Sequence, residues 1–258
     1  MASSSTRTRP RREQPYYPLS PVPYPLSPEP PGETLDTLPP EDPFARRLRG
    51  LGPLGILAIL IVLAGNFIIA PLSAVLVLVW VWVSRTPWRE IGYIWPESWI
   101  RTAAGGIAFG IALKFLMKAI VMPLLGAPPV NQAFHYLAGN SAALPYAIYL
   151  MIVVAGFGEE TVFRGYLFER MGKLFGSSVW AKTFIVLSTS ALFGVGHYAF
   201  QGLAGAQQAT LVGLLFGTIF AITGRIWMLM VAHAAFDLTA LAMIYWDVES
   251  WVAHLVFK

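Results

Sequence analysis

The stretch that decides the fold is residues 142–160, AALPYAIYLMIVVAGFGEE, which carries no charge until its last two positions. A run of about 20 apolar residues is long enough to cross a bilayer as a helix. Further apolar runs occupy most of positions 51–246, and the chain is 56% hydrophobic and only 12% charged. Soluble domains contain about 25% charged residues. The sequence therefore predicts an all-α fold, a polytopic bundle of transmembrane helices.

The apolar runs predict seven spans. The block 51–84 is long for one span and short for two, but Gly65, Asn66 and Pro71 interrupt it near its middle, which favours two. The predicted spans are 51–66, 69–84, 102–125, 142–160, 180–197, 207–223 and 226–246.

The distribution of basic residues predicts the orientation of this bundle. With seven spans, the regions around Arg46, Arg89, Arg170 and Arg225 lie on one side, and the loops 126–141 and 198–206 on the other contain no Lys or Arg. Cytoplasmic loops are enriched in Lys and Arg, so we expect a cytoplasmic N-terminus. We expect a multi-pass integral membrane protein of a bacterial plasma membrane.

The N-terminal segment differs in composition from the rest of the chain. Residues 1–45 hold 12 of the 20 prolines and repeat the sequence YPLSP at 17–21 and 24–28. Such a segment favours extended conformations and cannot bury a core. We expect a disordered, Pro-rich cytoplasmic tail over 1–45, whose partner is unknown, and a transmembrane domain over 46–258 with a motif-bearing core at 142–246.

Ionisable residues inside the apolar runs indicate a functional site. Such residues are costly in lipid and usually face one another or a wet cavity. On a helix Glu160 and Arg164 share a face, whereas Glu159 points about 140° away from Arg164. We assign Glu160 and Arg164 to structure and Glu159 to chemistry, the alternative being a surface ion pair at the helix end. The candidate catalytic set is Glu159, Glu160, Arg164, His197, His233 and Asp237.

The second half of this set lies on two other predicted spans. His233 and Asp237 are four positions apart on one helix face, and His197 ends the span 180–197. Asp237 could orient the imidazole, share a metal with it, or hydrogen-bond a developing oxyanion. Lys114 and Lys118, also four apart, could line the same cavity or snorkel to the membrane surface, and we favour snorkelling.

These motifs resemble those of the CPBP intramembrane metalloproteases, also called the CAAX-prenyl-protease-2-like or Abi family. The pattern is Glu-Glu-x-x-x-Arg, Phe-x-x-x-His and His-x-x-x-Asn/Asp on successive apolar segments, and the resemblance covers roughly residues 85–246. It implies a catalytic role for Glu159, with Glu160 and Arg164 as the second glutamate and the arginine. His197 is the family's middle histidine. The last pair falls on His233 and Asp237, where the family carries Asn or Asp.

The resemblance and the residues together predict an endopeptidase that hydrolyses a peptide bond near the cytoplasmic membrane face. Glu159 and His197 would activate a water, directly or beside a divalent ion, and His233 and Asp237 would complete the site. Zinc is the expected ion for such a set, with His197 and His233 as ligands, and a metal-free mechanism stays open. The expected substrate is a membrane-associated protein or peptide, prenylated or not, and no nucleic acid is expected.

Two other classes of protein fit the same residues. Buried Glu, His and Asp also form proton relays, which is typical of a proton-coupled transporter. A catalytically silent scaffold or immunity protein would keep the fold without the reaction.

Overall fold

The computed structural model describes residues 42–257, and this part of the chain is all-helical, with no strand. The predicted all-α class is therefore confirmed. Most of the predicted tail lies outside the described residues, but helix α1 (Pro43–Arg49) begins within it. The Asp42 side chain accepts a hydrogen bond from the backbone N–H of Phe44 (2.9 Å), and Pro43 occupies the first helical position. Both features favour the start of a helix. The described helical part of the chain therefore begins at Pro43, inside the predicted tail 1–45.

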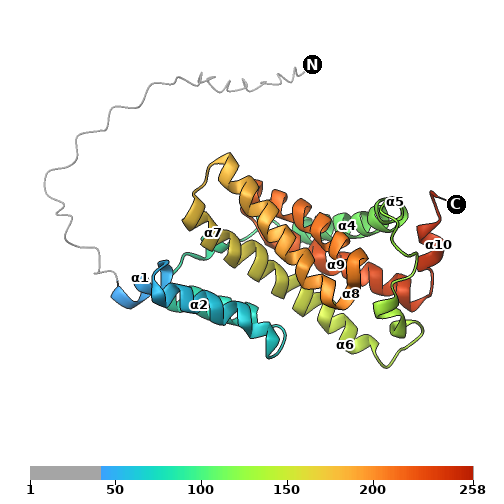
Figure 1. The fold of residues 1–258 in the computed structure, drawn as a ribbon, viewed down its shortest axis with the longest axis horizontal. Helices are drawn as coiled ribbons and strands as arrows, with labels where there is room; N and C mark the ends of the chain where they lie inside the picture. Colours follow the sequence, from blue (N-terminus) through green and yellow to red (C-terminus); the bar gives the residue numbers. More distant parts are fainter. Residues whose placement is uncertain (1–41, 258) are drawn as a thin grey trace, which may run out of the picture. The chain divides into compact units, whose positions relative to one another are not determined.

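Helices follow one another with short connections through the rest of the chain (Figure 1). The first half contains α2 (Pro53–Ala64), η2 (Gly65–Phe67), α3 (Leu72–Ser84), η3 (Trp88–Ile91), α4 (Trp99–Leu116), η4 (Met117–Val121), α5 (Met122–Leu124) and η5 (Gln132–Leu137). The second half contains α6 (Leu144–Tyr149), η6 (Leu150–Glu159), η7 (Thr161–Leu167), α7 (Phe168–Phe175), α8 (Val179–Thr223), α9 (Trp227–Tyr245) and α10 (Glu249–Ala253).

The predicted count of seven spans is not confirmed. Within residues 42–257, four helices are long and apolar enough to cross a membrane, or up to five if the bent pair Pro43–Arg49 and Pro53–Phe67 is one span. The block 51–84 does break near its middle, but α2 and α3 have only 12 and 13 residues. About 20 residues are needed to cross the hydrocarbon core, so two short helices do not satisfy that length.

Helix α8 contains two of the predicted spans because it folds back on itself at Gly202. Gly202 has φ 63° and ψ −161°, a conformation that side-chain-bearing residues rarely adopt. Gly213 consequently lies against Ser190, and Gly194 against Thr210, as expected for antiparallel packing. We call residues 179–201 the first arm and 203–223 the second arm of α8.

Helix α9 lies between two neighbours that approach its backbone closely. A Cβ on Gly110 of α4 would lie 2.2 Å from the carbonyl oxygen of Ala232, and one on Gly156 of η6 would lie 2.9 Å from that of Met230. Small residues allow such close approach between membrane helices. Gly110 and Gly156 therefore serve the packing of α9 against its neighbours.

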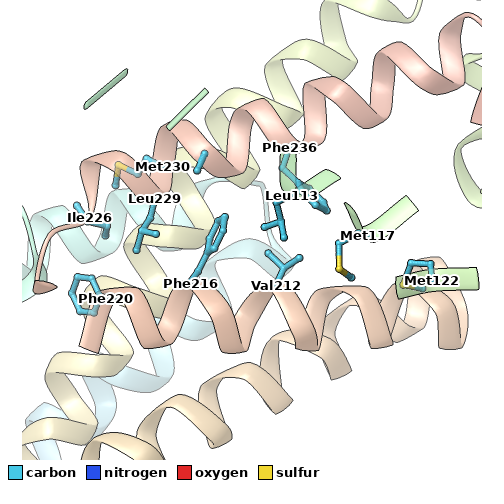
Figure 2. Close-up of a cluster of buried hydrophobic side chains, with 11 residues drawn as sticks. Leu113, Met117, Met122, Val212, Phe216, Phe220, Ile226, Leu229, Met230 and Phe236 are labelled. Atoms are coloured by element: carbon cyan, nitrogen blue, oxygen red, sulfur yellow. The ribbon is translucent and has the colours of Figure 1, made fainter. Parts of the chain in front are cut away.

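The main apolar core joins α4, the second arm of α8, and α9. Figure 2 shows Val212, Phe216 and Phe220 directed from α8 toward side chains of α4 and α9. The remaining buried members of this cluster are Leu113, Met117, Met122, Ile226, Leu229, Met230, Ala232 and Phe236. This core packs α9, which carries His233, against α8, which carries the aromatic side chains beside that histidine.

Candidate functional site

The two glutamates lie where two π-helical segments meet. Segment η6 ends at Glu159, and η7 begins at Thr161. The wider π-helical turn is rare and occurs frequently at functional sites. Here it belongs to a continuous helix, Leu144–Phe175, which is apolar enough to span a membrane. The two adjacent carboxylates thus lie within a continuous, apolar helix and not in a loop.

One carboxylate oxygen of Glu160 accepts hydrogen bonds from two partners. Its Oε1 lies 2.8 Å from Nη1 of Arg164 and 2.7 Å from Nδ1 of His233. Glu160 is fully buried, and Arg164 and His233 are only 2% and 4% exposed. A buried carboxylate requires such partners, because an unpaired charge in the interior is very costly. The predicted Glu160–Arg164 pair is present, and it also positions the histidine.

Aromatic rings enclose this buried group. The rings of Phe193 and Phe216, one from each arm of α8, lie 6.0 and 5.8 Å from the ring of His233. The guanidinium of Arg164 lies 4.8 Å from the centre of the Phe193 ring, within the range of a cation–π interaction. The rings exclude water from the ion pair, which strengthens its electrostatic attraction.

Two further carboxylates converge on the other nitrogen of His233. Oε2 of Glu159 and Oδ2 of Asp237 each lie 3.7 Å from Nε2. Both side chains are 23% exposed, unlike that of Glu160. Adjacent glutamates therefore contact opposite nitrogens of one imidazole, Glu160 at Nδ1 and Glu159 at Nε2. The separation of 3.7 Å at Nε2 is too long for a direct hydrogen bond.

His197 lies near this cluster, and within residues 42–257 it forms no ion pair with the other site residues. Its Nδ1 is 2.8 Å from the carbonyl oxygen of Phe193, and its ring is 4.5 Å from the Phe193 ring. A cavity of about 90 Å³ is lined by His197, His233 and Asp237. The structure therefore brings five of the six predicted residues into one cluster around His233 and places the sixth on a shared cavity.

A second cavity of about 180 Å³ adjoins the first, because the two share lining residues. It is lined partly by Gln132 and Ala133, which are exposed. These residues belong to the loop 126–141, which the distribution of basic residues places away from the cytoplasm. The lining thus favours an opening on that side, whereas hydrolysis near the cytoplasmic membrane face implies a site that opens to the cytoplasm or to the inner leaflet. The orientation of the bundle stays a prediction.

Several polar residues near the site differ from their predicted role or were not predicted to belong to it. Lys114 and Lys118 are buried in cavity walls, 7% and 8% exposed, so they do not snorkel to the surface. Gln201 and Gln208 line both cavities and were not singled out. The only feature of the sequence that could have indicated them is that these polar residues lie in or beside apolar runs. The direction in which they face depends on the fold-back at Gly202, which the sequence did not predict.

The two histidines predicted to hold zinc differ in the oxygen that each ring meets. Nδ1 of each histidine meets an oxygen acceptor, a carboxylate for His233 and a backbone carbonyl for His197. Metal-binding histidines are commonly oriented in this way. However, no three His, Asp or Glu side chains within residues 42–257 are grouped so that they could hold a metal ion. Within the described residues, the arrangement of these side chains does not fit a bound metal.

The fold and the buried cluster define an integral membrane protein with a polar site of histidines and carboxylates inside its helices. Residues 141–239 match the model of the family described as "Type II CAAX prenyl endopeptidase Rce1-like". This match confirms the resemblance to the CPBP/CAAX protease family, and it includes all six predicted site residues. Comparisons with curated proteins and with solved structures gave no match.

Proposed function

We propose that this protein is an intramembrane endopeptidase in which Glu159 is the general base. The observation that supports this role best is the convergence of Glu159 and Asp237 on Nε2 of His233, beside a cavity. Oε1 of Glu160 is engaged by Arg164 and by Nδ1 of His233, and its Oε2 is buried without a hydrogen-bond partner, so Glu160 is a positioning residue. The family match supports an endopeptidase in general.

The proposed reaction uses the two carboxylate environments differently. Glu159 takes a proton from a water as the water oxygen attacks the peptide carbonyl carbon, and His197 orients that water from the cavity wall. The Nε2–H of His233, with Asp237 beside it to orient the imidazole, donates to the carbonyl oxygen, which becomes negatively charged in the tetrahedral intermediate. The proton on Glu159 then passes to the leaving amine nitrogen as the carbon–nitrogen bond breaks.

The first experiment compares wild-type protein with Glu159→Gln in proteoliposomes loaded with a library of membrane-anchored peptides. Mass spectrometry would identify new C-termini, which we expect from wild type and not from Glu159→Gln. The matched control is Glu97→Gln, because Glu97 is an exposed glutamate paired with Arg101 (3.8 Å) far along the chain from the motif. Equal cleavage by Glu159→Gln would contradict the assigned base, and no cleavage by wild type would favour a silent scaffold. The Glu159→Gln variant would also serve to trap the substrate.

The metal prediction is tested separately by elemental analysis of purified protein. If zinc is held by His197 and His233, His197→Ala and His233→Ala will each lower the metal content relative to wild type. Equal, negligible metal in all three proteins would support the metal-free mechanism, in which Glu159 and the histidines act alone.

A further inference from the structure

The two cavities meet at a ring of hydrogen-bond donors. Five residues line both of them, and we call this set the neck: Lys114, Asn131, Gln201, Gly205 and Gln208. Every neck residue with a side chain carries N–H donors, and none is acidic. The catalytic cluster on one side, by contrast, is rich in carboxylates. A shared wall with one cation and several amide donors is suited to an anionic group.

The direct contacts of Lys114 are with neutral groups, and the carboxylates of Asp237 and Glu249 act on its charge only over longer distances. Its Nζ lies 3.3 Å from Oε1 of Gln208 and 4.7 Å from the centre of the Phe236 ring. Lys114 is 7% exposed. A buried ammonium without a carboxylate partner is costly, and an anion that binds beside it would lower that cost.

The other charged groups of the cavity walls are already paired. Nζ of Lys118 lies 2.8 Å from Oε1 of Glu249, whose Oε2 accepts the backbone N–H of Asn131 at 3.2 Å. Asp237 is directed to Nε2 of His233. Of the two lysines of these walls, Lys114 is consequently the one with no carboxylate in direct contact.

We infer that Lys114, together with Gln208, is a specificity-determining element that binds a carboxylate of the substrate at the neck. The ammonium of Lys114 donates to one carboxylate oxygen. The amide NH₂ of Gln208, whose oxygen faces Lys114, donates to the other. The carboxylate belongs either to the C-terminus of the substrate or to an acidic side chain. This inference rests on the proposed function, because only an endopeptidase would have this ligand as a substrate. Binding of the carboxylate itself does not require cleavage.

Binding is therefore measured on the full-length Glu159→Gln protein in detergent, so that no probe is consumed. The first probe is N-acetyl-Ala-Val-Leu with a free carboxylate, and the second is the same peptide as a C-terminal amide. We expect the acid to bind at least tenfold more tightly than the amide by calorimetry. A third probe, N-acetyl-Ala-Glu-Leu amide, reports on a side-chain carboxylate.

The variants assign the preference to the neck. Adding Lys114→Met should reduce the acid-to-amide ratio to about one, Lys114→Arg should retain most of it, and Gln208→Leu should lower it. Lys182→Met is the matched control, because Lys182 is an exposed lysine whose Nζ donates to the carbonyl oxygen of Ala221. If Lys114→Met does not fold, Gln208→Leu carries the test.

The outcomes separate this inference from the proposed function. Equal affinity for acid and amide in the Glu159→Gln protein, no binding of either, or a ratio that survives Lys114→Met would each overturn the inference. Tight binding of the glutamate probe would support it and identify a side-chain carboxylate as the source. Loss of cleavage activity is read in the proteoliposome assay alone, so a failed reaction with a preserved acid preference contradicts only the proposed function.

Discussion

Oε1 of Glu160 lies 2.7 Å from Nδ1 of His233, although 73 positions separate the two residues. The same oxygen lies 2.8 Å from Nη1 of Arg164. One buried carboxylate therefore joins the helix Leu144–Phe175 to α9 and fixes the orientation of the imidazole. Its neighbour Glu159 is partly exposed and stays available at Nε2. The adjacent glutamates thus differ in burial and in partners.

The first prediction concerns the stability of this buried group. Replacing Glu160 by Gln leaves Arg164 as an unpaired buried charge, which costs about 3–5 kcal/mol. We expect a clear loss of thermal stability in detergent for Glu160→Gln. Glu159→Gln should unfold close to wild type because Glu159 has no such ion pair with an arginine. A double variant with Glu160→Leu and Arg164→Met should recover part of the loss. Equal stability of Glu160→Gln and wild type would contradict the anchoring role.

A second prediction concerns Asp237 and rests on the proposed reaction. An Asn at this position keeps an oxygen and adds an N–H donor toward the substrate carbonyl, so Asp237→Asn should retain activity within about tenfold. Asp237→Ala removes the polar group and should lower kcat by about 10²–10³. Single-turnover cleavage rates would check both values. Similar activity of the Ala and Asn variants would remove Asp237 from the reaction.

A third prediction concerns the fold-back of α8. Gly202 has a backbone conformation that is essentially restricted to glycine, so Gly202→Ala should destabilise the protein by about 1–3 kcal/mol. Gly196 is the matched control, because it lies in the helix with no atom within 4 Å of an added Cβ. Gly196→Ala should leave stability unchanged or raise it by about 0.5–1 kcal/mol. Thermal unfolding of the two variants would distinguish a local backbone effect from a general effect of alanine.

A fourth prediction tests the orientation of the bundle. The chain contains no cysteine, so single cysteines can report accessibility without a background. The exposed residues Gln132 and Ser177 lie in the loops that we place outside and in the cytoplasm, respectively. A membrane-impermeant maleimide should label Gln132→Cys in intact cells and Ser177→Cys only after permeabilisation. The reverse pattern would invert the predicted topology and place the cavity opening in the cytoplasm.

A fifth prediction concerns Tyr93, which lies in the connection before α4. Its hydroxyl lies 2.7 Å from Oγ1 of Thr161, whose own hydrogen is donated to the carbonyl oxygen of Phe157, so Tyr93 is the donor. Burial raises the pKa of Tyr93 to about 12. Below pH 10, Tyr93→Phe should cost about 0.5–1.5 kcal/mol.

The pH dependence of that difference follows from the same pKa. The folded-state pKa is about 12 and the ordinary value is 10.0, so the unfolded state loses its proton first. The stabilisation by Tyr93 is present below pH 10 and is lost as the pH rises toward 12. Unfolding of wild type and Tyr93→Phe at several pH values would check this. A constant difference up to pH 12 would contradict it.

The sequence by itself determined the helical membrane class, the break in the block 51–84 and the ion pair of Glu160 with Arg164. Long apolar runs dictate the first, glycine and proline the second, and helical spacing of four residues the third. Each of these depends on neighbours within a few positions. The family motifs also named the residues that the structure gathers around His233.

Only the tertiary structure decided which distant side chains meet. Helical spacing does not state that Glu160 contacts His233, nor that Lys114 contacts Gln208. Those contacts depend on how closely α9 packs against its neighbours and on the reversal of α8 at Gly202. The physical reason is that periodicity specifies the face of a helix, whereas packing between helices specifies what that face contacts.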